Sequence, residues 1–121
     1  MNFEEHAAKP ILTSVGISVP KGRLVANPDE AAIAATEIGE CVVKAQIPVG
    51  KRGKAGGVQL AHTSDEAKVH AKQMIGMVIG GHTVEKVLVE ARTDIVREFY
   101  AAILNDPETK SPLIMFSTEG G

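Results

Sequence analysis

Residues 41–57 combine a strand-like segment with a glycine-rich loop that carries several cations. Lys44 lies between apolar residues, and the loop that follows holds Lys51, Arg52 and Lys54 among the glycines Gly50, Gly53, Gly56 and Gly57. Glycine lets backbone N–H groups approach a ligand closely, and an arginine fork can hold two phosphate oxygens. The pattern is typical of a polyphosphate-binding β-hairpin, although from these residues alone a solvated basic hairpin is about equally good.

This loop is not a P-loop. It lacks the Gly-Lys-Ser/Thr ending, and the segment after it, residues 57–62, has the pattern of a strand rather than a helix. From the residues alone, a lysine between apolar neighbours is more often a snorkelling edge residue than a ligand. The alternation places Val43 and Ala45 on one face of the strand and Lys44 on the other.

Capping patterns predict three helices. Each pattern places a side-chain acceptor three residues before a glutamate: Asn2 and Glu5, Asn27 and Glu30, Thr63 and Glu66. We expect helices over residues 2–15, 28–38 and 64–79, which would end at Gly16, Gly39 and Gly80-Gly81. Pro10 lies inside the first of these helices and predicts a kink or a break there.

Apolar and alternating runs predict the strands, at residues 22–26, 41–47, 57–62, 85–91, 97–104 and 112–117. Residues 105–109 have the composition of a turn that joins the last two strands into a hairpin. The order of elements indicates one α+β or α/β layered domain, with no repeat and no interdomain linker.

Composition excludes several classes of protein. The chain has 121 residues, a net charge of −2 and one cysteine, Cys41, so it offers neither a basic surface for nucleic acid nor a disulfide framework. No apolar run is long enough to span a membrane. The four histidines lack metal-ligand spacing, so we expect no metal site and read Cys41 as a core residue. We expect a cytoplasmic protein, and a mitochondrial matrix location stays open.

Five ordered segments resemble one family. They are residues 1–9, 16–22, 42–57, 88–95 together with 98–100, and 116–121. They resemble the beta subunit of succinyl-CoA synthetase and related ADP-forming acyl-CoA ligases, which are ATP-grasp proteins. The resemblance implies the N-terminal portion of an ATP-grasp fold: a mixed β-sheet, about three helices and a glycine-rich β-hairpin whose loop closes over phosphates. Because family members continue beyond the last motif, we expect residues 1–121 to be a truncated nucleotide-binding portion.

The resemblance also implies site residues. In similar proteins the positions of Lys44, Lys51, Arg52 and Gly53 contact nucleotide phosphates. Three further positions would contact the nucleotide: Glu90 and the Thr93 backbone at the adenine edge, and Glu98 from the following strand. Taken without the family, these three are ordinary surface residues at strand ends.

The chain departs from the family at three positions. Pro48 and Lys51 stand where a His and a Gly are common, which stiffens the loop and adds charge. Arg92 stands where an Ala is usual, beside the expected base site, so it either alters purine preference or points to water. Pro20 falls at another position close to the base.

By resemblance, the complete protein joins a carboxylic acid, most simply succinate, to CoA with ATP, through an acyl phosphate and a phosphohistidine. This chain would bind ATP or ADP, with no catalytic residue of its own. The Mg²⁺ ligands would lie outside it, and a partner alpha subunit would carry CoA and the phosphohistidine. We expect the isolated chain to be inactive and to self-associate through the hairpin of residues 97–117. Two alternatives stay open: a malate- or citrate-activating ATP-grasp ligase, and a non-catalytic module that binds a nucleotide or a partner.

Overall fold

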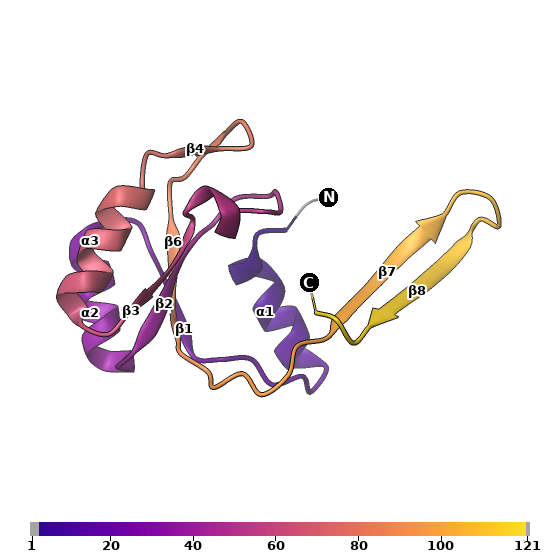
Figure 1. The fold of residues 1–121 in the computed structure, drawn as a ribbon, viewed down its shortest axis with the longest axis horizontal. Helices are drawn as coiled ribbons and strands as arrows, with labels where there is room; N and C mark the ends of the chain where they lie inside the picture. Colours follow the sequence, from indigo (N-terminus) through magenta and orange to yellow (C-terminus); the bar gives the residue numbers. More distant parts are fainter. Residues whose placement is uncertain (1–2, 121) are drawn as a thin grey trace.

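The computed structural model describes residues 3–120 and is built in layers (Figure 1). A four-stranded sheet has two helices on one face and one helix on the other, and a separate two-stranded hairpin extends away from it. The helices are α1 (Glu5–Ser14), α2 (Pro28–Ile38), α3 (Ser64–Met74) and the short 3₁₀ helix η1 (Gly53–Ala55). The strands are β1 (Gly22–Val25), β2 (Cys41–Ala45), β3 (Val58–Ala61), β4 (Val78–Ile79), β5 (His82–Thr83), β6 (Val87–Ala91), β7 (Tyr100–Asp106) and β8 (Ser111–Ser117).

The main sheet has the order β1-β6-β2-β3. Strands β1 and β2 are both antiparallel to β6, so they run in the same direction but are separated by that strand. In the same way β2 separates β3 from β6. We expected a mixed sheet; the pairings within residues 3–120 are all antiparallel, because in each β-α-β unit another strand lies between the two parallel ones. The α+β class with three α-helices and a glycine-rich hairpin is confirmed.

The core lies between the sheet and the pair α2 and α3. Both helices contribute mainly alanines, including Ala31, Ala34, Ala67 and Ala71, which are fully buried. Small side chains let the helices lie close to the strands, whose buried valines come from every second position of β2 and β6. The opposite face of β2 and β6, which carries Lys44 and Glu90, turns toward α1.

Two of the three predicted caps are present. The Asn27 side chain accepts the N–H of Glu30 at 2.9 Å, and the Thr63 hydroxyl accepts the N–H of Glu66 at 3.2 Å. The third, at Asn2, lies outside the described residues. Helix α1 begins at Glu5 rather than residue 2 and has no side-chain cap. It continues past Pro10 to Ser14 instead of breaking there.

The predicted end of the third helix is wrong. Helix α3 ends at Met74, five residues before the predicted end, because Gly76 adopts φ +92° and its N–H donates to Val84 instead of continuing the helix. Residues 78–83 form the small hairpin of β4 and β5, turned by Gly80 and Gly81, which both have positive φ.

The hairpin of β7 and β8 was predicted with its turn. Asp106 accepts hydrogen bonds from the Glu108 N–H at 2.9 Å and from the Thr109 hydroxyl at 2.8 Å, which holds the turn. The two strands pair only with each other among the described strands, and apolar side chains are exposed on both of their faces. No helix in residues 3–120 is long and apolar enough to cross a membrane.

Candidate functional site

A cavity of about 1060 Å³ opens where the glycine-rich loop meets α1 and β2. Its lining includes three cations, Lys44, Lys51 and Arg52, and two carboxylates, Glu5 and Glu98. The remaining wall is loop backbone and apolar side chains: Phe3, Ile47, Pro48, Val49, Gly50, Gly53 and Val58. Charged groups beside an apolar wall suit a ligand with a polyanionic part and an uncharged part.

Lys44 reaches the cavity from β2. Its neighbours Val43 and Ala45 are buried against the helices, so Lys44 points to the α1 face, as the alternation predicted. Its Nζ lies 2.9 Å from Glu5 Oε1 and 2.6 Å from Glu90 Oε1. Burial disfavours its charge, but the hydrogen bonds and charges of the two glutamates outweigh burial and raise its pKa above the usual 10.5.

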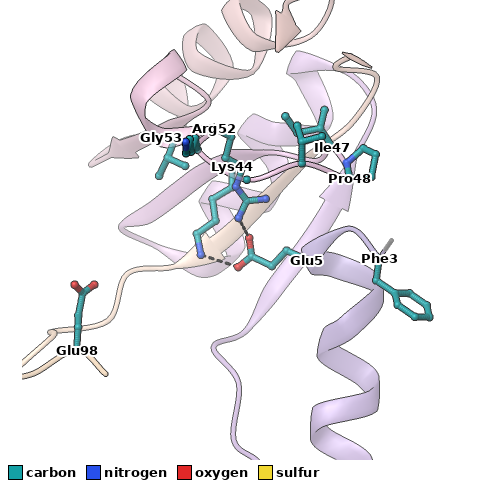
Figure 2. Close-up of a pocket in the computed structure, with 12 residues that line it drawn as sticks. Phe3, Glu5, Lys44, Ile47, Pro48, Arg52, Gly53 and Glu98 are labelled. Carbon is teal, nitrogen blue, oxygen red and sulfur yellow. Dashed lines mark hydrogen bonds and ion pairs between the residues drawn. The ribbon is translucent and has the colours of Figure 1, made fainter. Parts of the chain in front are cut away.

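Arg52 comes from the loop and meets the same glutamate. Its Nη1 donates to the Ala45 carbonyl at 3.0 Å, which anchors the loop to the end of β2, and its Nη2 pairs with Glu5 Oε2. Burial of Glu5 opposes ionisation, but Lys44 and Arg52 together hold its pKa below the usual 4.5. Figure 2 shows both cationic groups directed at this one carboxylate.

Glu90 is the most buried charged group near the cavity, with 7% of its side chain exposed. Besides Lys44 it pairs with Lys9 of α1, whose Nζ also donates to the Pro20 carbonyl at 2.7 Å. Gly22, opposite Glu90 in the sheet, makes room for this contact, because a Cβ there would lie 3.2 Å from Lys9 Nζ. Glu90 is therefore not a surface residue at a strand end.

The loop has two demanding backbone positions. A Cβ at Gly57 would lie 3.0 Å from Ile79 Cδ1 and 3.1 Å from the Arg52 carbonyl, so any larger residue would require these neighbours to shift. Lys51, which stands where the family commonly has glycine, adopts φ +63°, a left-handed conformation that lysine disfavours. Around Gly53, by contrast, a Cβ would meet nothing within 4 Å.

The remaining predicted residues separate into two groups. Glu98 lines the cavity from the segment that leads into β7, apart from the other charged groups (Figure 2). Thr93 is exposed and is not among the residues that line the cavity. Arg92 pairs with Glu40 at 2.7 Å and with Asp94 at 3.7 Å, so its guanidinium is held at the end of the sheet.

Three contributors were not predicted as site residues: Glu5, Lys9 and Gln46. Buried Gln46 accepts the backbone N–H of His6 at 2.9 Å and so fastens α1 to the sheet. Glu5 and Lys9 are four residues apart, which places them on one face of a helix. This spacing indicates that one face of the helix carries both charges, and the structure places that face against Lys44 and Glu90 of the sheet.

The expected ligand, ATP or ADP, would bind together with Mg²⁺. Both Glu5 oxygens already accept from cations, and Glu98 is the other carboxylate of the cavity lining. Within residues 3–120, no three His, Cys, Asp or Glu side chains come together as a metal site. Mg²⁺ at a nucleotide usually binds one or two carboxylates together with phosphate oxygens and water, and Glu98 is the lining carboxylate that would be available for it.

The family follows from comparison with known proteins. The sequence profile of the ATP-grasp domain matches residues 2–121. This chain belongs to the ATP-grasp family. The same fold is found in the dinucleotide-forming acetyl-coenzyme A synthetase 1 of Ca. Korarchaeum cryptofilum, solved with coenzyme A and Ca-AMPCP, at a TM-score of 0.81 and 28% identity over 96% of this chain and 53% of that one.

Among curated relatives, this ATP-grasp chain is similar to beta subunits of succinate–CoA ligases. It is 48% identical to the GDP-forming beta subunit of Thermus thermophilus and 45% identical to the ADP-forming beta subunit of Halorubrum lacusprofundi, over 122 aligned residues in each case. All of this chain is matched, and it spans 32% of the length of each relative. The resemblance stated from the sequence motifs is confirmed.

Proposed function

We propose that this chain is the phosphate-binding part of the nucleotide site of an ADP-forming carboxylate–CoA ligase. The observation that carries the proposal is the convergence of Lys44 and Arg52 on one cavity wall, with Lys51 beside them. Charge-assisted N–H groups from a strand and a glycine-rich loop are the donors that polyphosphates need. Such groups position a phosphoryl group and stabilise its charge without supplying a nucleophile.

The role of each residue follows from its position. Lys44 and Arg52 would each donate to phosphate oxygens, Lys51 would add charge at the rim, and the open space around Gly53 would admit a phosphate close to the backbone. Glu98 would contact the nucleotide from the opposite wall. For Glu90 we propose an indirect role, because both its neighbours Lys44 and Lys9 occupy its oxygens. Thr93 stays assigned to the adenine edge by resemblance alone.

The wider reaction is proposed from the relatives. Succinate is the substrate named in the curated beta subunits, and these names include both ADP-forming and GDP-forming enzymes. We propose ATP or ADP as the nucleotide, Mg²⁺ bound mainly by residues outside this chain, and transfer through an acyl phosphate and a phosphohistidine. A CoA-binding alpha subunit would be the partner, in the cytoplasm. By itself the chain would bind nucleotide without catalysing ligation, so the pure chain should release no ADP when CoA and succinate are added.

Calorimetric titration with Mg-ATP tests the binding proposal. We expect the chain to bind Mg-ATP and Lys44→Ala to weaken binding by about 10- to 100-fold, the effect of losing a charge-assisted contact. Lys54→Ala is the matched control, because Lys54 belongs to the same loop but not to the cavity lining. Equal losses in both variants would indicate nonspecific attraction by a basic loop. Absence of binding by the unmodified chain would overturn the proposal, and a parallel titration with Mg-GTP reports the purine preference.

A further inference from the structure

Several polar contacts join α1 to the sheet. No α1 side chain is buried, and the described contacts to the sheet include Glu5 with Lys44, Lys9 with Glu90, and the His6 N–H with Gln46. These contacts link the first two turns of α1 to charged and polar side chains of the sheet. The position of Glu5, in the first turn, is therefore coupled to the positions of the cations it binds.

Glu5 joins two cations that come from different elements. One carboxylate oxygen accepts from Lys44 on β2 and the other from Arg52 on the loop. Both cations have long, flexible side chains, which lose conformational freedom when they bind a ligand. A single anion that holds both removes part of that cost before the ligand arrives.

Lys44 and Arg52 keep N–H groups that their contacts with glutamates and backbone do not use. A lysine ammonium has three N–H groups, of which Glu5 and Glu90 take two for Lys44. An arginine has five, and the described contacts of Arg52 use one to the Ala45 carbonyl and one to Glu5. Both residues also line the cavity, so the remaining N–H groups of each can serve a ligand there.

We propose that Glu5 is a positioning residue of the phosphate site, which holds the Lys44 ammonium and the Arg52 guanidinium together so that both donate to one polyphosphate. The inference rests on the proposed nucleotide-binding function for its ligand. The negative charge of Glu5, which Lys44 and Arg52 stabilise, keeps both carboxylate oxygens available as acceptors at neutral pH. Lys44 and Arg52 contact different oxygens of Glu5, so glutamine in its place would turn an NH₂ donor instead of an acceptor toward one of the two cations.

If Glu5 competed with the ligand instead of positioning the cations, its removal would change the affinity in the opposite direction. If Glu5 only occupied the place of a phosphate, its removal would raise the net positive charge of the cavity and tighten binding. A positioning role predicts weaker binding in spite of the added positive charge. The sign of the change in affinity therefore separates the two roles.

The test compares Glu5→Gln with Glu4→Gln in the 121-residue chain. Glu4 is the adjacent carboxylate. It lies 3.3 Å from His6 Nδ1 and 3.6 Å from Lys86 Nζ, and it does not line this cavity. We expect Glu5→Gln to weaken binding of Mg-ATP by about tenfold, and to leave adenosine binding unchanged. Unchanged or tighter Mg-ATP binding by Glu5→Gln would overturn the proposal, and an equal loss for adenosine would show a general structural effect instead.

A second measurement needs no nucleotide. The side-chain carbons of Lys44 report its titration by NMR, and Glu5→Gln should lower the pKa of this lysine toward the usual 10.5 while Glu4→Gln leaves it unchanged. A Lys44 titration that Glu5→Gln does not move would overturn the positioning role even if the chain bound no nucleotide. Failure of the unmodified chain to bind Mg-ATP, with the expected Lys44 shift, would instead reject the nucleotide as ligand.

Discussion

The Lys44 ammonium lies 2.6 Å from the Glu90 carboxylate, so two residues that the family resemblance assigns to different ends of the nucleotide form one ion pair. They belong to adjacent strands, with Lys44 opposite Leu88 and Glu90 opposite Val42. The two side chains are therefore diagonal neighbours on one face of the sheet. The lining of the cavity and the sheet beneath α1 share a single chain of charges: Arg52, Glu5, Lys44, Glu90 and Lys9.

Replacing the buried carboxylate should destabilise the fold. We expect Glu90→Gln to lower the free energy of unfolding by about 2–4 kcal/mol, because Lys9 and Lys44 would each lose a buried anion but keep another acceptor. Urea unfolding followed by circular dichroism measures it. Glu37→Gln is the control: Glu37 pairs with Arg23 on the surface and should cost less than about 1 kcal/mol. Similar losses in the two variants would show that the Glu90 network adds little to stability.

Replacing Lys51 with glycine should stabilise the fold but weaken the binding of Mg-ATP. Its φ of +63° disfavours a side chain with a Cβ, so Lys51→Gly should raise the free energy of unfolding by about 1 kcal/mol. The same substitution removes a cation from the cavity and should weaken Mg-ATP binding. Lys54→Gly, in η1 where φ is not positive, should not stabilise the fold. Destabilisation by Lys51→Gly would show that the lysine makes contacts that outweigh its backbone strain.

The ion pairs between α1 and the sheet predict an acid limit and an alkaline limit to the pH range in which α1 stays attached. The folded pKa of Glu5 is lowered, so its contribution to stability is complete above about pH 4.5 and is lost as the pH falls through the folded value. The folded pKa of Lys44 is raised, so its contribution is complete below about pH 10.5 and is lost as the pH rises through the folded value. The attachment of α1 should therefore weaken at both extremes and hold between them.

NMR can follow both limits. The His6 amide, which donates to Gln46, reports the attachment of α1 on the acid side, and the Lys44 side-chain carbons report the alkaline side. The Ile75 amide, which donates to the Ala71 carbonyl at 2.9 Å, is an internal reference that depends on neither group. A His6 amide that keeps its chemical shift well below pH 4.5 would show that α1 stays attached without the charge of Glu5.

The exposed hairpin predicts self-association of this chain. Ile103 and Ile114 face each other across β7 and β8 and each is 74% exposed, which is unusual for paired apolar residues of a monomer. Unpaired strand edges next to such residues favour strand addition. We expect sedimentation velocity to show dimers or larger species. The double variant Ile103→Lys, Ile114→Glu, in which a cross-strand charge pair replaces the apolar pair, should be monomeric.

Ile33→Lys is the control for the hairpin. Ile33 is exposed on α2, away from the hairpin, so its replacement should leave association unchanged. A monodisperse monomer of the unmodified chain would reject the expectation, and loss of association in Ile33→Lys would move the contact to the helical face.

Features that depend on neighbours within a few residues were predictable from the sequence. The caps at Asn27 and Thr63 need only an acceptor three residues before a free N–H, and the turn at Asp106 needs only its own side chain. The two faces of β2 follow from alternation, and so does the direction of Lys44. Family motifs in the same local segments led to Arg52 and Gly53, which the structure places in the lining of the cavity with Lys44.

The long-range contacts were decided by the tertiary structure. The insertion of β6 between β1 and β2 brings Glu90 beside Lys44, which is 46 residues away in sequence, and α1 brings Glu5 to the same ammonium from 39 residues away. Helix α3 ends at Met74 because Gly76 bonds to Val84. The sequence by itself indicated the three helices, the longer strands and the cations that line the cavity, but not the small hairpin of β4 and β5. Only the folded chain decided which carboxylates hold those cations, because ion pairs between distant segments depend on how the sheet is ordered, and no local pattern specifies that order.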